Sequence, residues 1–143
     1  MINSYDGNQN MGVCVVVVDD DNVLLGKRKN AYKSGWFGLP GGRLDIGEPF
    51  QDCGKRELIE ETSLNDVLLT YVGIVREYQD DYDFFHIVYT GILQKKQPIV
   101  NEPNKCESWN WFPMNAIPEK TLPGHREAIK MFKNNKNLID LHK

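Results

Sequence analysis

Apolar residues gather in separate segments along the chain, with polar turns between them, and this pattern predicts a series of strands. Residues 11–18 form a continuous valine-rich run, which is typical of a strand buried on both faces. An acidic turn at residues 19–22 separates this run from a second apolar segment at residues 23–28, so the two are expected to form a β-hairpin. Further strands are expected at residues 67–78, 84–93 and 106–112.

Two segments have the features of helices. Pro49 suits the first helical position, because its fixed φ fits the helix and its missing N–H would have no partner there. Good helix formers continue from this proline to about Thr62. A second helix is expected over residues 124 to about 134, with Ile129 and Phe132 on one side. Strands combined with one central and one C-terminal helix predict an α/β fold, in which helices cover both faces of a sheet.

The length of 143 residues is enough for one domain with its own core, without disulfides or a structural metal. Residues 1–10 are polar and are expected to form a mobile tail, which leaves residues 11–143 as a single domain. The N-terminus lacks a basic start followed by an apolar run, so no secretory signal is expected. No apolar stretch approaches the length of a membrane span. The protein is therefore expected to be cytoplasmic, with no membrane partner.

Charge and cysteine content narrow the class of ligand. The net charge is −3 and the isoelectric point is near 5.6, so the chain lacks the basic surface that a nucleic acid polymer requires. Cys14, Cys53 and Cys106 are scattered, with no C-x-x-C pair for a zinc site. An odd, unclustered set of cysteines fits a reducing compartment. A small-molecule ligand is therefore expected.

The central helix concentrates negative charge on one side. Glu57, Glu60 and Glu61 fall within a wedge of about 100° on a helical period. Phe50 and Cys53 point to nearly the same side, so the wedge faces protein at its N-terminal end. Carboxylates beside a buried surface carry a large desolvation cost unless cations compensate it. The simplest alternative to a cation-binding face is a solvated, charged helix face. The loop that precedes the helix distinguishes between these two interpretations.

That loop, residues 39–42, holds a proline and two glycines just before the helix, which allows backbone to approach a ligand closely. Arg56 neutralises only part of the glutamate charge. Oxygen ligands from carboxylates suit Mg²⁺ or Mn²⁺, which keep several waters and bind substrate phosphates. The combination favours a divalent metal site over a solvated face.

The spacing of one glycine, one arginine and four glutamates carries the strongest signal. The pattern G-x5-E-x7-R-E-L-x-E-E is formed by Gly42, Glu48, Arg56, Glu57, Leu58, Glu60 and Glu61. It resembles the Nudix box at every defined position except Ser63, where the family usually has glycine. Segments 23–28, 35–42 and 106–112 are similar to the MutT-like branch of that family. The resemblance implies a Nudix-type α/β/α sandwich with a mixed β-sheet.

The resemblance also implies a chemistry, in which water attacks a phosphorus of a nucleoside diphosphate linked to another group. The leading expectation is a metal-dependent hydrolase that converts a (d)NTP to the (d)NMP and pyrophosphate, including oxidised or non-standard nucleotides. An ADP-ribose or nucleotide-sugar pyrophosphatase is the alternative within this chemistry, and a non-catalytic nucleotide-binding sensor is the alternative of another class. Mg²⁺ is the implied cofactor, with Mn²⁺ as a substitute. A small nucleotide is the implied partner, and a homodimer is left open.

Residue roles follow from matching positions. The implied metal ligands are the Gly42 carbonyl, Glu48, Glu57, Glu60 and Glu61. The implied catalytic group consists of Arg56, which orients the carboxylates, together with Glu57 and Glu60. Glu57 is similar to the position that some members use as general base, and Glu102 or Glu107 in a later loop is the alternative base.

Substrate-binding residues are expected outside the box. Arg28 resembles a phosphate-contacting arginine, with a strand-end surface charge as the alternative. Trp36 and Trp111 are candidates for stacking on a base, and the resemblance favours Trp111, although core packing is the better explanation for any single aromatic residue. Asn115 has the donors and acceptors to read a base edge. His86 lies within an apolar strand and is interpreted as structural.

Overall fold

The computed structural model describes residues 10–142, so nearly all of the expected N-terminal tail lies outside the described residues. Eight strands occur in the described part: β1 (Met11–Asp19), β2 (Asn22–Arg28), β3 (Phe37–Gly38), β4 (Gly41–Arg43), β5 (Leu69–Gln79), β6 (Tyr82–Ile92), β7 (Cys106–Pro113) and β8 (Leu138–His142). The two helices are α1 (Phe50–Thr62) and α2 (Pro123–Lys133).

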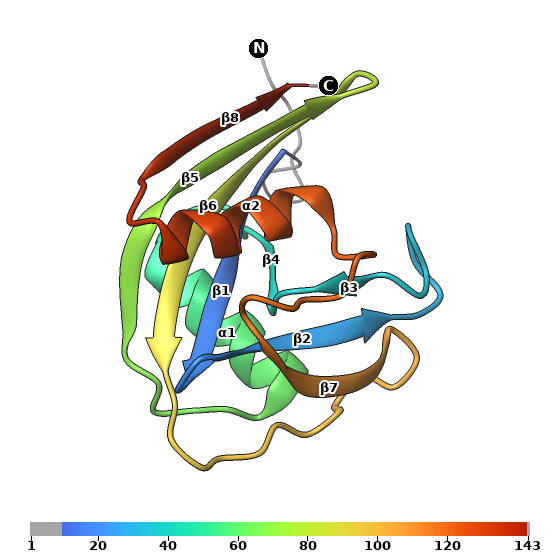
Figure 1. Ribbon diagram of the computed structural model, residues 1–143, viewed down its shortest axis with the longest axis vertical. Coiled ribbons are helices and arrows are strands. Elements are labelled where there is room, and N and C mark those ends of the chain that lie inside the picture. Colours follow the sequence, from blue (N-terminus) through green and yellow to red (C-terminus); the bar gives the residue numbers. More distant parts are fainter. Residues whose placement is uncertain (1–9, 143) are drawn as a thin grey trace.

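One mixed sheet contains all of these strands. Its central path runs β3-β2-β1-β6-β5-β8, while β4 pairs with β1 and β7 pairs with β2. The β1–β6 and β5–β8 pairs are parallel, and the others are antiparallel. Figure 1 shows α1 and α2 on opposite faces of the sheet. The expected α/β sandwich with a mixed sheet is therefore confirmed.

The valine run of β1 lies at the centre and explains why both faces need a helix. Cys14, Val16 and Val18 pack in one apolar cluster with residues of α2, among them Ile129. Val15 and Val17, which point the other way, pack in a second cluster with Leu58 of α1. Alternate residues of a strand point to opposite faces, so a strand that is apolar at every position must be covered on both.

Most predicted elements are confirmed within one or two residues. The expected hairpin exists, with Val18 opposite Val23 across the turn. Both helices begin and end within two residues of the predicted positions. Strands β3, β4 and β8 were not predicted, because they are short or lie in glycine-rich or polar sequence.

The end of α1 shows how the chain accommodates serine in place of the usual glycine. Ser63 has φ 61°, in the left-handed region that favours glycine. Its N–H donates to the Ile59 carbonyl at 2.9 Å and closes the last turn. The helix therefore stops in the geometry expected for glycine, and the carboxylates before it keep their places. Neither α1 nor α2 is both long and apolar enough to cross a bilayer.

Candidate active site

Arg56 on α1 holds three glutamates together. Its Nε and Nη2 donate to the two carboxylate oxygens of Glu48, at 2.7 and 2.9 Å. Its Nη1 donates to Glu57 Oε1 at 2.8 Å and to Glu60 Oε2 at 3.3 Å. The hydrogen bonds from Arg56 lower the pKa of Glu48 to about 2. A two-pronged, charge-assisted contact of this kind fixes both partners in one orientation.

Glu57 lies directly against Gly42 at the end of the glycine loop. A Cβ added at Gly42 would overlap the Glu57 carboxylate, so this close approach requires glycine. Burial raises the pKa of Glu57, against the lowering effect of Arg56. The Gly42 carbonyl accepts a weak hydrogen bond from the Cys53 thiol, with 3.7 Å between sulfur and oxygen. Its expected role as a metal ligand stays a prediction.

Glu61 is the most desolvated carboxylate of the group. Burial raises its pKa to about 8, opposed by a hydrogen bond from the Gly41 N–H. That bond measures 2.8 Å to Oε1. Negative charge on Glu57 and Glu102 adds to the rise in the pKa of Glu61. An ionised carboxylate at this position therefore requires a cation nearby.

These features fit a hard divalent cation. Glu57 and Glu61 supply carboxylate oxygens one helical turn apart, beside a loop whose backbone they contact. Arg56 is already shared among three glutamates, so it cannot offset the charge on Glu61 as well. Oxygen donors and excess negative charge are the chemistry that Mg²⁺ and Mn²⁺ prefer. Glu48 and Glu60 lie in the same cluster through Arg56, and their direct ligation stays a prediction.

The two alternative candidates for the general base, Glu102 and Glu107, differ in position. Glu102 lines a cavity of about 250 Å³ together with Glu61 and Arg28. Glu107 instead approaches Lys27, with 3.8 Å between Nζ and Oε2. Glu107 lies in β7 and not in a loop as expected, and of the two glutamates the structure brings Glu102 to the carboxylate cluster.

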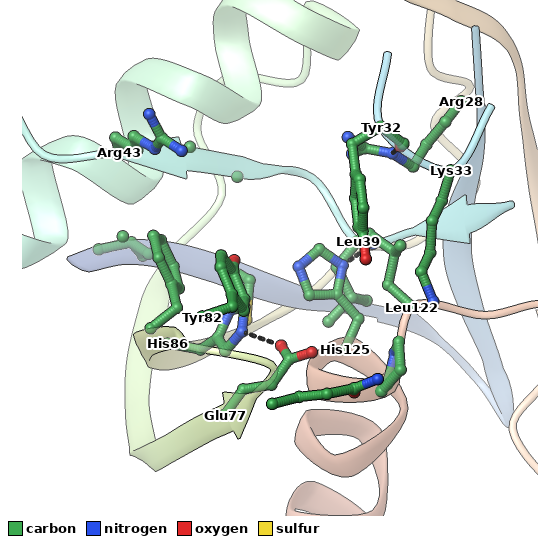
Figure 2. A pocket seen from close by; sticks show the side chains of 18 of the residues that line it. Arg28, Tyr32, Lys33, Leu39, Arg43, Glu77, Tyr82, His86, Leu122 and His125 are labelled. Atoms are coloured by element: carbon green, nitrogen blue, oxygen red, sulfur yellow. Dashed lines mark hydrogen bonds and ion pairs between the residues drawn. The ribbon is translucent and has the colours of Figure 1, made fainter. Parts of the chain in front are cut away.

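A larger cavity of about 520 Å³ starts at this cluster. Gly42 and Glu61 line one part of it, and His86 and His125 line another. Figure 2 shows Arg28, Arg43, His86 and His125 around one space. Three cationic side chains also line this cavity: Arg28, Lys33 and Arg43. Its volume and these three cationic side chains suit a ligand with several phosphate groups.

Of the predicted substrate-binding residues, Arg28 alone lines these two cavities. Trp36 lies under Lys33, with 4.1 Å from Nζ to the ring centre. Trp111 packs against the apolar cluster beneath α1. Asn115 accepts a hydrogen bond from Lys133. Stacking or base-reading roles for Trp36, Trp111 and Asn115 stay predictions, and the structure gives each of them another contact.

Sequence reasoning assigned no site role to four residues that line the larger cavity, which are Glu77, Tyr82, Phe84 and His125. His86, interpreted as structural, is buried but also lines the cavity. A signal was present in β6, where Tyr82, Phe84 and His86 occupy alternate positions and share one face of the strand. His125 comes from α2, far away in sequence, and no local pattern marks it.

Known proteins resemble this chain along most of its length. A family model for the NUDIX domain matches residues 8–132. A Bacillus subtilis (strain 168) protein named 8-oxo-dGTP diphosphatase is 29% identical over 126 residues, which cover 86% of this chain and 79% of that protein. An ADP-ribose pyrophosphatase of Methanocaldococcus jannaschii is 28% identical over 122 residues, which cover 85% of this chain and 72% of that protein.

A solved structure agrees with the fold. The MutT NUDIX hydrolase from Burkholderia pseudomallei superposes with a TM-score of 0.79 and 29% sequence identity, covering 85% of this chain and 96% of that one. The family match spans α1, α2 up to its penultimate residue, and all strands of the described residues except β8. Together with the box residues gathered around Arg56, these similarities show that the chain belongs to the NUDIX domain family and is a MutT-like Nudix hydrolase.

Proposed function

We propose that the protein is a metal-dependent pyrophosphohydrolase that converts a nucleoside triphosphate, including oxidised or non-standard forms, to the monophosphate and pyrophosphate. The observation that carries the proposal is the larger cavity, which joins the carboxylate cluster at Glu61 to a wall with three cationic side chains. A triphosphate needs both features. Its charge must be neutralised, and the scissile phosphorus must lie beside the carboxylates.

A bound Mg²⁺ would supply charge neutralisation and would make a bound water more acidic. Glu57 and Glu61 would hold it, because their oxygens flank the glycine loop and the negative charge of Glu61 has no cationic partner among the contacts described for it. Arg56 keeps Glu57 in place through the contact at 2.8 Å. Glu48 in turn restricts the Arg56 guanidinium by its two hydrogen bonds.

The reaction cleaves the anhydride between the α- and β-phosphorus with water. The water oxygen bonds to one of these two phosphorus atoms, the bond from that atom to the bridging oxygen breaks, and the bridging oxygen leaves with the other phosphorus, which gives the monophosphate and pyrophosphate. A carboxylate accepts the proton from water. Glu57 and Glu102 are the candidates, since both lie in or beside the cluster. Arg28, Lys33 and Arg43 along the cavity would bind the remaining phosphate oxygens.

A second candidate is hydrolysis of ADP-ribose or a nucleotide sugar, favoured by the similarity to the ADP-ribose pyrophosphatase of Methanocaldococcus jannaschii. The bond cleaved is again a phosphoanhydride next to the same carboxylates. The two candidates differ in what the rest of the cavity must accommodate. A non-catalytic sensor is disfavoured, because the arginine and all four glutamates of the box are present and in contact around Arg56 or Gly41.

The test is a panel assay with Mg²⁺ that separates products by chromatography. It includes standard triphosphates, 8-oxo-dGTP and ADP-ribose. Monophosphate plus pyrophosphate from triphosphates is the expected result, with loss of turnover in excess chelator. Cleavage of ADP-ribose alone would replace the first candidate by the second. Release of inorganic phosphate with a nucleoside diphosphate left behind would overturn both.

A further inference from the structure

One part of the larger cavity is lined by polar and aromatic side chains from three elements. Glu77, His86 and His125 come from β5, β6 and α2 and meet there (Figure 2). Tyr82 and Phe84 of β6 line the same part of the cavity, with their rings parallel to within 1° and their centres 5.8 Å apart. Aromatic faces beside polar atoms are the usual surroundings of a nucleobase.

The hydrogen bonds of His125 determine what it presents to a ligand. The Leu39 N–H donates to His125 Nδ1 at 2.9 Å. A ring nitrogen that accepts a hydrogen bond cannot carry the proton of a neutral imidazole, so Nε2 carries it. Burial keeps the pKa of His125 well below 6.5, so the ring is neutral near pH 7. His125 therefore offers one N–H donor.

Glu77 offers a hydrogen-bond acceptor. Its Oε1 contacts His86 Nε2 at 2.9 Å. A carboxylate has about four lone-pair sites on its two oxygens, so one such contact leaves accepting capacity. The same atoms pack against the first turn of α2, because a Cβ at Gly124 would overlap both Glu77 Oε1 and His86 Nε2. This contact places the Glu77 carboxylate beside the residue that precedes His125.

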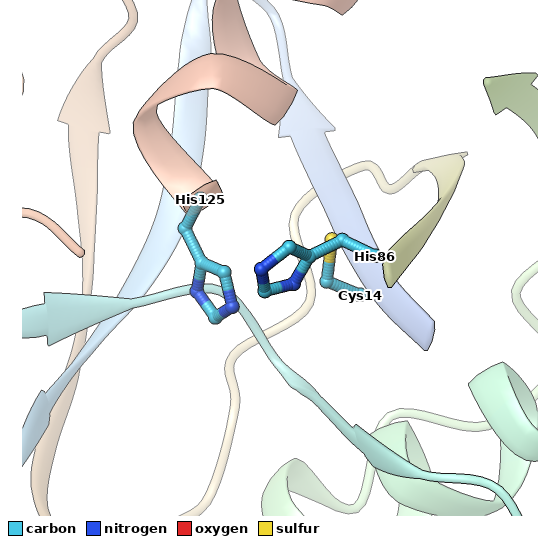
Figure 3. A group of neighbouring side chains, drawn as sticks. All are labelled: Cys14, His86 and His125. Carbon is cyan, nitrogen blue, oxygen red and sulfur yellow. The ribbon is translucent and has the colours of Figure 1, made fainter. Parts of the chain in front are cut away.

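A metal site is the other interpretation of this region. Cys14, His86 and His125 each place one potential ligand atom within 4.8 Å of the others (Figure 3). Two observations oppose it. His125 Nδ1 is used by the Leu39 N–H, which leaves a proton on Nε2, where a metal would have to bind. Burial raises the pKa of the Cys14 thiol to about 12, so the sulfur keeps its proton. The trio is better described as part of a hydrogen-bonding wall.

We infer that His125 and Glu77 read the edge of a nucleobase, and that they select bases that carry an oxo group next to a ring N–H. His125 Nε2–H donates to the oxo group, and the Glu77 carboxylate accepts from the neighbouring N–H. Guanine, hypoxanthine, uracil and thymine have this edge. Adenine and cytosine have the reverse, an amino donor next to a ring nitrogen acceptor. With adenine or cytosine, the His125 N–H would face the amino donor of the base, and the Glu77 carboxylate would face the lone pair of the ring nitrogen.

This inference rests on the proposed function, since it assigns the base end of the same cavity. It predicts strong discrimination, because a site built to hydrogen-bond one group leaves its own buried polar atoms unpaired with the wrong one. Hypoxanthine and adenine make the sharpest comparison, since they have the same size and differ at this edge. The pair uracil and cytosine repeats the comparison on a smaller ring.

The experiment measures kcat/KM for ITP, ATP, UTP and CTP with the full chain and Mg²⁺. ITP should exceed ATP by at least tenfold, and UTP should exceed CTP. Glu77→Gln should lower the ITP/ATP ratio, because an amide can donate to the adenine ring nitrogen as well as accept, while the discrimination by His125 remains. His125→Asn should also lower the ratio, with thermal unfolding used to show that it remains folded. Glu127→Gln, the same change on α2 in a residue that pairs with Lys130, should keep the wild-type ratio.

The two proposals fail in different ways. Equal or faster hydrolysis of ATP would overturn the edge assignment and leave the proposed function in place. A variant that lowers all four rates in proportion, with the ITP/ATP ratio unchanged, would show a purely structural role for that residue and would also overturn the assignment. If no triphosphate is cleaved, the proposed function fails. The edge assignment is then tested by calorimetry with IMP and AMP, where tighter binding of IMP supports it and equal binding overturns it.

Discussion

Arg56 binds both carboxylate oxygens of Glu48, eight residues earlier in the chain, through Nε at 2.7 Å and Nη2 at 2.9 Å. The pair ties the start of α1 to its middle and leaves Nη1 for Glu57. The geometry of the carboxylate cluster therefore depends on a residue that need not touch substrate.

Replacing Glu48 should make the protein less stable above pH 5 and should change its response to acid. The folded pKa of Glu48 is about 2, below the ordinary value of 4.5, mainly because Arg56 donates to it. A lowered pKa contributes stability that is fully present above 4.5 and is lost as the pH falls toward 2. Allowing for solvent screening, we expect Glu48→Gln to cost about 1–2 kcal/mol at pH 6. Urea unfolding of both proteins at pH 6 and pH 3 should show the difference shrinking at the lower pH.

In the metal-free protein, the contribution of Glu61 to stability should change with pH in the direction opposite to that of Glu48. Its folded pKa is raised to about 8 by burial, so the stability it contributes is present below pH 4.5 and is lost as the pH rises through 8. In chelator, wild type should therefore lose stability between pH 5 and 8.5 relative to Glu61→Gln. Added Mg²⁺ should raise the unfolding temperature of wild type more at pH 8.5 than at pH 6. A metal effect of equal size in Glu61→Gln would contradict the placement of the cation beside this carboxylate.

Glu57→Gln should lower kcat by two or more orders of magnitude, because it removes charge beside the glycine loop without changing shape. Losses of this size are usual when an acid–base or electrostatic group is removed from an active site. Circular dichroism and the unfolding temperature check that the variant is folded. Glu119→Gln, an exposed glutamate before α2, is the matched control and should keep wild-type kcat. A near-native rate for Glu57→Gln would mean that the helix face is only solvated charge.

Much of this fold could be predicted from the sequence, because strong periodic signals are local. The valine run of β1 and the proline before α1 indicate their elements without reference to the rest of the chain. Strand β4 was missed because its three residues form a strand only by pairing with β1, as in the Val13–Gly42 pair. Strand β8 likewise depends on its parallel pairing with β5.

The same rule decides which site residues could be predicted from the sequence: residues close together in the chain could be found, and residues brought together by the fold could not. Box residues lie on one helix and one loop, so their spacing reveals them. Another part of the cavity lining comes from β5, β6 and α2, and Glu77 and His125 line one cavity only through the tertiary fold. Trp111 was predicted from its place in a motif to stack on a base, and the structure adds a packing contact with the cluster beneath α1 that the motif does not indicate. Its stacking role stays a prediction.

Ser63→Gly should stabilise the protein. Serine adopts φ 61° at the end of α1, a left-handed conformation that costs a residue with a Cβ about 1 kcal/mol relative to glycine. The change removes the hydrogen bond from Asn101 Nδ2 to Ser63 Oγ, which is exposed and contributes little. We expect a net gain of about 0.5–1 kcal/mol in the free energy of unfolding. Ser63→Ala is the control, because it loses the same hydrogen bond and keeps the strain, so it should be destabilising.

Substitutions of Trp111 and Tyr82 should distinguish a packing role from a substrate-binding role. Trp111 packs with the apolar cluster under α1, so Trp111→Ala should lower the free energy of unfolding by about 2–4 kcal/mol. It should leave the relative KM values for different nucleotides unchanged below the unfolding temperature.

Tyr82 is 46% exposed and lines the larger cavity, so Tyr82→Ala should change stability little. Loss of a stacking face should raise KM by roughly 5- to 100-fold, from about 1–3 kcal/mol per stacked base. Thermal unfolding and steady-state kinetics on both variants check the pair. The reverse result, in which Trp111→Ala raises KM and Tyr82→Ala does not, would place the base on the α1 side of the sheet and away from the cavity that holds His125.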